Sequence, residues 1–153
     1  MKRFNFSLQP LLNLKMQQED QLKNELGRAV RKLEVEKERL EELHRQREAG
    51  VEDFHAASFK GVTVEKLKEY QAFFAFLQDR ILLQKEVIHV EQTNVDKIRG
   101  DLLKIVQERE MLDKLKTRKY EEYLKELEKD EQKINDELIS FKRNLRAAGE
   151  ENG

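Results

Sequence analysis

The sequence predicts an all-α protein, a long antiparallel two-helix coiled-coil hairpin with an overhanging second helix. Two observations carry this prediction. Apolar residues recur at alternating steps of three and four in two long stretches, and the segment Ser58–Val62 between them interrupts the pattern. A repeat averaging 3.5 residues keeps two helices in contact as they wind around each other. Because the second stretch is much longer than the first, one helix should extend past its intramolecular partner.

The composition is typical of a coiled coil and not of a globular enzyme. Charged residues make up 40% of the 153 residues, proline occurs once and tryptophan is absent. This profile is typical of long helices. The 30 basic and 31 acidic residues are interleaved and give a net charge of -1. Nucleic-acid-binding proteins usually carry a one-sided basic excess, so we expect no nucleic-acid partner.

The sequence also bears on compartment and membrane. It contains no cysteine, so a disulfide framework and a thiolate metal site are both excluded. The first three residues are basic, but polar residues and a proline between positions 5 and 10 interrupt any signal-peptide core. The longest uncharged apolar run, 73–77, is far shorter than the roughly 20 residues of a membrane helix. We therefore expect a cytoplasmic protein that does not span a membrane.

The helices and their connection can be placed along the chain. We expect a single hairpin domain over 1–153, with helix one over about 7–57, a turn over 58–62, helix two over about 63–146 and a frayed tail over 147–153. Pro10 suits a first helical turn, where its missing N–H would have no intrahelical partner. Thr63 can cap the second helix.

Each helix contributes one apolar seam. The seam of helix one consists of Leu22, Leu26, Ala29, Leu33, Leu40 and Leu43. The seam of helix two consists of Leu67, Tyr70, Phe74, Leu77, Ile81, Ile88, Val95, Ile98, Leu102 and Ile105. Two neighbouring registers fit them, one with Leu26 opposite Ile98 and one with Leu26 opposite Glu91. The first register buries more apolar pairs, so we prefer it.

Several positions in the seams are not apolar. They are Glu36, Arg47, Gly50, Gln84, Glu91, Arg109 and Lys116. A polar seam residue lowers stability and can fix the register of a coiled coil. Two interpretations stay open, a marginal coiled coil that tolerates surface-like residues and a hairpin loose enough to adapt to a partner.

In either register Phe4 reaches only the region 113–120, so residues beyond Tyr120 should overhang. The overhang carries its own stripe, formed by Tyr120, Leu124, Leu127, Ile134, Leu138, Phe141 and Leu145. This stripe could pack on the start of helix one, form a seam with a second copy, or dock another protein.

Residue patterns for catalysis are missing. The sequence has no phosphate-binding glycine loop, no nucleophile elbow and no His-Glu-x-x-His zinc motif. His44, His55 and His89 lie apart, and His44 with Glu48 is best read as a solvated pair. We expect no enzyme activity, no cofactor and no metal site.

Two apolar clusters exceed what the hairpin needs. One runs from Phe4 to Leu14 at the start of helix one, where a short membrane-surface element is a minor alternative. The other spans 70–77 near the turn. Phe73 and Phe76 cannot both face the seam, so at least one should be exposed. An exposed aromatic on a chain without a deep core indicates a contact with a partner protein.

These clusters carry a family resemblance. The block Phe-x-Phe-x-Leu-x-x-Leu-Leu-x-x-Lys resembles the opening of the FliJ family of flagellar export proteins. It consists here of Phe4, Phe6, Leu8, Leu11, Leu12 and Lys15. A central Tyr-Gln-x-Phe-x-x-x-Leu signature is similar to the segment of Tyr70, Gln71, Phe73 and Leu77. Length and the longer second helix agree, so the resemblance covers essentially the whole chain.

The resemblance implies a non-enzymatic, stalk-like adaptor in flagellar type III export. It would couple the export ATPase ring (FliI-like) to the export gate protein (FlhA-like), escort export chaperones, and lie peripherally at the cytoplasmic face of the inner membrane. The implied ATPase-ring contacts are Phe4, Phe6, Leu8, Leu11, Leu12, Lys15, Tyr120, Leu124, Leu127, Ile134, Leu138 and Phe141. The implied export-gate contacts are Leu40, Leu43, Tyr70, Phe73, Leu77 and Gln84.

Two other functions remain open. One is the equivalent stalk of a virulence-type secretion system, which shares the hairpin. The other is a homo-oligomeric coiled-coil scaffold in which the overhang is the dimer seam. The adaptor hypothesis expects a monomer when the protein is free.

Overall fold

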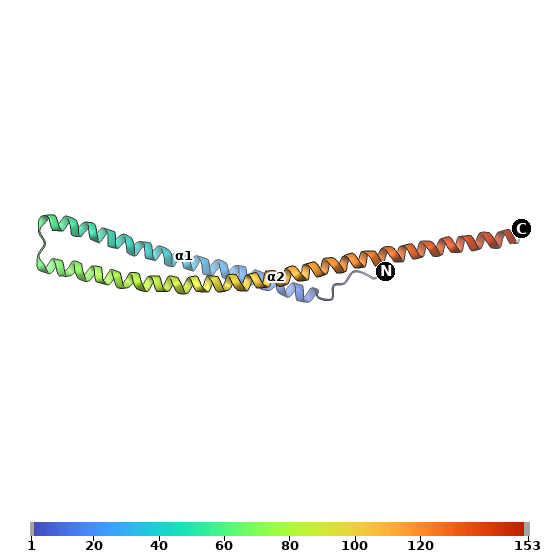
Figure 1. Cartoon of the computed structure of the whole chain (residues 1–153), viewed down its shortest axis with the longest axis horizontal. Coiled ribbons are helices and arrows are strands. Elements are labelled where there is room, and N and C mark those ends of the chain that lie inside the picture. Colours follow the sequence, from blue (N-terminus) through green and yellow to red (C-terminus); the bar gives the residue numbers. More distant parts are fainter. Residues whose placement is uncertain (1, 152–153) are drawn as a thin grey trace. The chain divides into compact units, whose positions relative to one another are not determined.

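The computed structural model describes residues 2–151 and contains two long helices (Figure 1). Helix α1 is Gln9–Lys60 and helix α2 is Val64–Glu151. No strand occurs among the described residues. The predicted all-α helical hairpin is thus confirmed as a fold class.

The connection between the helices is shorter than the expected turn over 58–62. Helix α1 continues to Lys60, and Gly61 follows with a φ of 88°. This left-handed conformation is accessible to glycine at little cost and ends many helices. Thr63 then caps α2, because its Oγ1 accepts a hydrogen bond from the backbone N–H of Lys66 at 3.2 Å. Residues 58–60 stay helical because nothing before the glycine stops α1.

The outer ends of the helices also differ from the expected bounds. Helix α1 begins at Gln9 and not near residue 7, since the N–H of Gln9 bonds to the carbonyl of Phe6 in a turn at 3.0 Å. Helix α2 reaches Glu151, where a frayed tail from residue 147 was expected. The segment 146–148 is Arg-Ala-Ala, which strongly favours a helix. The last two residues of that predicted tail lie outside the described residues.

Contacts divide the chain into two compact units. Unit 1 combines the N-terminal residues up to Gln17 with the residues from Val106 onward, and unit 2 is Gln18–Ile105. A single hairpin domain over 1–153 stays a prediction.

Unit 2 is an antiparallel pair of helical segments around a narrow apolar core. Ala29, Leu33 and Val95 are buried together. Leu26 and Ile98 pack against this cluster from the two helices, which is the preferred register. Near the turn the rings of Phe54 and Tyr70 meet edge to face with their centroids 5.3 Å apart. The alternative partner of Leu26, Glu91, instead forms an ion pair with Lys32 at 3.1 Å.

A polar layer interrupts this core at two of the predicted non-apolar seam positions. The Gln84 side-chain amide donates to the carbonyl oxygen of Glu36 at 2.8 Å and to the carboxylate oxygen Oε2 at 2.6 Å. The Arg39 guanidinium donates to the other carboxylate oxygen at 2.9 Å. Glu36 is buried, and a buried carboxylate is tolerated only when such donors surround it.

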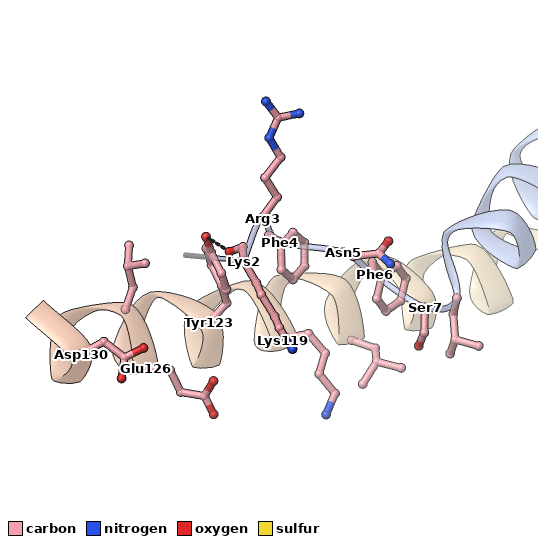
Figure 2. A pocket seen from close by; sticks show the side chains of 13 residues that line it. Lys2, Arg3, Phe4, Asn5, Phe6, Ser7, Lys119, Tyr123, Glu126 and Asp130 are labelled. Carbon is pink, nitrogen blue, oxygen red and sulfur yellow. Dashed lines mark hydrogen bonds between the residues drawn. The ribbon is translucent and has the colours of Figure 1, made fainter.

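Unit 1 packs the N-terminal residues on the second half of α2. Phe6 and Leu12 are buried there, and the ammonium of Lys15 lies 2.7 Å from a carboxylate oxygen of Glu108. Residues 2–8 precede α1 and are not helical. Figure 2 shows this segment running along α2.

Candidate functional site

The candidate functional sites lie on the surfaces of the two units. Within residues 2–151, no group of three or more His, Asp or Glu side chains is placed to hold a metal ion. Neither helix, over that same range, has a stretch long and apolar enough to cross a membrane. The candidate sites are exposed apolar faces, one in each unit.

In unit 1, α2 becomes bare after its contact with the N-terminal segment. Every residue from Glu128 to Glu151 is exposed. This stretch retains large apolar side chains, namely Ile134, Leu138, Ile139, Phe141 and Leu145. Four of them follow the three-four spacing of a coiled-coil seam, at positions 134, 138, 141 and 145. We call these four residues the bare stripe.

The covered part of α2 extends further than the sequence predicted. The Phe4 ring lies edge to face on Tyr120, with centroids 5.1 Å apart, and also contacts Tyr123 at 5.6 Å. The Tyr123 hydroxyl donates to the carbonyl oxygen of Lys2 at 2.8 Å. The expected overhang of α2 is therefore present but begins after Leu127, and not directly after Tyr120. An extended chain advances about 3.3 Å per residue against 1.5 Å in a helix, so a non-helical N-terminal segment covers more of α2.

The residues proposed for an ATPase contact divide into covered and exposed members. Phe6 and Leu12 are buried within unit 1, and Phe4, Lys15 and Leu127 are half-buried. The exposed members are Leu8, Leu11, Tyr120, Leu124, Ile134, Leu138 and Phe141. The N-terminal residues and Tyr120 are brought together, whereas the bare stripe has no such cover. Tyr123 was missed, because it lies beside the apolar stripe and not in it.

In unit 2, the second candidate surface lies on α2 near the turn. Phe73 and Phe76 are both exposed, which confirms the prediction that at least one would be. Gly50 of α1 lies beneath Phe73, where an added Cβ would be only 2.8 Å from a ring carbon. The glycine thus allows the ring to lie close to α1. Arg80 lies over the face of Phe76, 5.3 Å from the ring centroid.

The residues proposed for an export-gate contact are unequal in exposure. Leu77 is only 1% exposed and belongs to the core of unit 2, so its side chain is not available to a partner. Tyr70 packs on Phe54, and Gln84 bonds to Glu36. Leu40 and Leu43 are half-buried, so Phe73 is the one exposed member of the set.

Sequence reasoning missed most of this second surface. Exposed apolar residues continue from Phe73 along α2, at Phe76, Leu83, Val87 and Val90. They follow three-four spacing except at Arg80, which occupies the position between Phe76 and Leu83. We call these five residues the outer stripe. The sequence obscures this spacing, because the more regular seam occupies the same stretch of α2 on a face about 100° away around the helix.

A comparison with protein families agrees with this architecture. The family model described as the flagellar FliJ protein matches residues 4–147, which is nearly the whole chain. The chain belongs to the FliJ family. FliJ-family proteins are non-catalytic components of the flagellar export apparatus. Searches among curated proteins and among solved structures give no match.

Membership of the FliJ family favours a flagellar role over the virulence-type stalk considered above. Both motifs that suggested the resemblance lie within the matched residues. The N-terminal motif begins at Phe4, where the match itself begins. The central motif contributes Phe73 to the outer stripe and Leu77 to the core of unit 2.

Proposed function

We propose that this FliJ-family chain is a stalk-like adaptor that joins the flagellar export ATPase ring to the export gate. The observation that carries the proposal is the bare stretch of α2 from Glu128 to Glu151. At 1.5 Å per residue this stretch is about 35 Å long, enough to enter a protein ring. Its apolar side chains have no cover in unit 1, and such a stripe favours a helical partner.

The bare stripe is the proposed contact with the ATPase. It combines apolar side chains with flanks of both charges, such as Glu137 and Lys142. Mixed flanks suit a stalk that contacts several similar subunits in turn, because no single strong charge pattern holds it in one orientation. Phe6 and Leu12 take part only indirectly, since both are buried against α2.

The outer stripe is the proposed contact with the export gate. Phe73 and Phe76 supply aromatic side chains of the kind that anchor protein interfaces. Leu77 lies in the core beneath them, so its side chain does not contact the gate directly. Binding at the gate would bring the protein to the cytoplasmic face of the inner membrane without a membrane span. The escort of export chaperones rests on the family resemblance alone.

The ATPase contact is tested by removing two side chains of the bare stripe. The Leu138→Ala/Phe141→Ala variant should bind the export ATPase at least about tenfold more weakly, because hydrophobic anchors dominate such interfaces. Binding is measured by surface plasmon resonance, and ATPase stimulation by phosphate release. The control is Ser140→Ala, which lies on the opposite face of the same helical turn. Unchanged binding by the double variant would contradict the proposal.

A homo-oligomeric scaffold is the second candidate, because the same exposed stripe could pair with another copy of this chain. Sedimentation equilibrium separates the two functions. The adaptor function expects a monomer whose mass does not depend on concentration. A dimer that the Leu138→Ala/Phe141→Ala variant dissociates would favour the scaffold.

A further inference from the structure

The N-terminal residues Lys2–Leu8 form an extended strap on α2, and the strap is held by side chains and not by a regular backbone ladder. Its fixed points are the Phe4 ring against Tyr120 and Tyr123, and the hydrogen bond from the Tyr123 hydroxyl to the carbonyl oxygen of Lys2. Figure 2 shows the strap running beside α2, with the Arg3 side chain pointing away from the helix. Such a segment can open locally without unfolding the helices.

A cleft that opens to solvent lies between the strap and the helix. It has a volume of about 650 Å³ and is lined on the α2 side by residues that include Lys119, Tyr123, Glu126 and Asp130. The strap therefore leaves part of this face of α2 open to the side chains of a partner.

The strap covers the N-terminal part of an apolar stripe on α2 whose C-terminal part is the bare stripe. Tyr120, Leu124 and Leu127 follow three-four spacing, and Ile134 begins the bare stripe one heptad after Leu127, beyond Glu131. A partner helix that pairs along the whole stripe must use the space that Phe4 now occupies beside Tyr120. The strap and such a helix cannot both bind this part of α2.

Charge indicates the chemistry of the occupant. Over 121–137, α2 has eight acidic and three basic residues, a formal charge of -5. The preceding stretch, 106–120, has three acidic and five basic residues and is therefore not acidic. The strap itself combines Lys2 and Arg3 with two phenylalanines. The end of the strap that carries these two basic residues lies at the start of the acidic stretch, where the Tyr123 hydroxyl bonds to the carbonyl oxygen of Lys2.

We propose that this face of α2 is a docking surface for a basic amphipathic helix of the export ATPase, and that the strap is its displaceable internal occupant. The inference rests on the proposed function. It adds that the partner helix is basic and that it competes with the strap for the same face of α2. Phe4 is then a competitor for the site and not a contact with the ATPase.

Displacement is tested with a single fluorophore. Because the chain contains no tryptophan, Phe4→Trp reports on the strap alone. Saturating export ATPase should shift its emission to longer wavelength, as the ring moves from Tyr120 into water. The control is Phe59→Trp, whose native side chain is 92% exposed in unit 2 and whose emission should not change.

Competition is tested by affinity. If the strap is closed in about nine of ten molecules, weakening it with Phe4→Ala should tighten ATPase binding about tenfold. Reversing the charge with Glu126→Lys/Asp130→Lys should weaken binding, whereas Glu110→Lys, on an exposed α2 position before the acidic stretch, should not.

The outcomes separate this inference from the proposed function. A complex that forms without an emission shift, or that Phe4→Ala weakens, overturns the displaceable strap and leaves the adaptor role intact. Failure of any complex to form overturns both. An emission shift caused by self-association of this chain, with no ATPase present, overturns the assignment of the partner.

Discussion

Two regions of α2 carry the same apolar spacing and meet opposite environments. In unit 2 the seam around Leu77 and Val95 is closed by α1, and these side chains are almost fully buried. In unit 1 the bare stripe around Leu138 repeats the pattern with every residue exposed. Spacing therefore defines which face of a helix is apolar, whereas a second segment defines whether that face is core or surface.

The comparison is tested most strongly by matched leucine truncations. Leu77→Ala should lower the free energy of unfolding by about 2–5 kcal/mol, because it removes a side chain that is 1% exposed and leaves a cavity. Leu138→Ala, at 53% exposure, should change it by less than about 0.5 kcal/mol. Urea unfolding followed by circular dichroism measures both. Equal losses would mean that the bare stripe is buried in solution.

The next largest effect concerns the polar layer that interrupts the closed seam. Gln84→Leu removes the amide that donates twice to Glu36, so a buried carboxylate loses part of its hydrogen bonding. We expect a loss of about 1–3 kcal/mol in the free energy of unfolding. Replacing both residues, in Glu36→Leu/Gln84→Leu, should restore stability to the native value or above it. If Glu36→Leu/Gln84→Leu is as unstable as Gln84→Leu, the loss does not come from leaving the Glu36 carboxylate without its donor.

The same layer should also select the register. A slip of one heptad would place Glu36 near Ile81, and Gln84 near Leu33, with both polar groups unpaired. Since the chain has no cysteine, the engineered pair Leu26→Cys/Ile98→Cys should form a disulfide, and Leu26→Cys/Glu91→Cys should not. In the Glu36→Leu/Gln84→Leu background the second pair should begin to cross-link. Its failure to do so would show that apolar packing alone selects the register.

The smallest expected effect is that of the ion pair between Lys32 and Glu91 at the edge of the closed seam. The lysine side chain is mostly exposed, so water and salt screen the interaction. Lys32→Ala should lower the free energy of unfolding by no more than about 1 kcal/mol, and 1 M salt should reduce that difference. A loss as large as that of Gln84→Leu would mean that the pair contributes more to the seam than its exposure suggests.

Much of the fold was predictable from sequence. Helix type, the approximate position of the connection and the preferred pairing of Leu26 with Ile98 all follow from periodicity and from residue preferences at helix ends. The candidate sites were less predictable. Leu77 belongs to the family signature but lies in the core, and the outer stripe beyond Phe73 was hidden by the seam pattern.

Sequence by itself determined that the chain forms two long helices and which face of each helix packs in the seam, because both depend on neighbours a few positions apart along one chain. Tertiary structure decided how much of the apolar face of α2 is covered by the N-terminal strap. The strap reaches Tyr123 because it is extended, and the apolar face beyond Glu128 is bare because no other part of unit 1 covers it. Those outcomes depend on contacts between residues more than 100 positions apart, such as Lys2 and Tyr123, which no local pattern encodes.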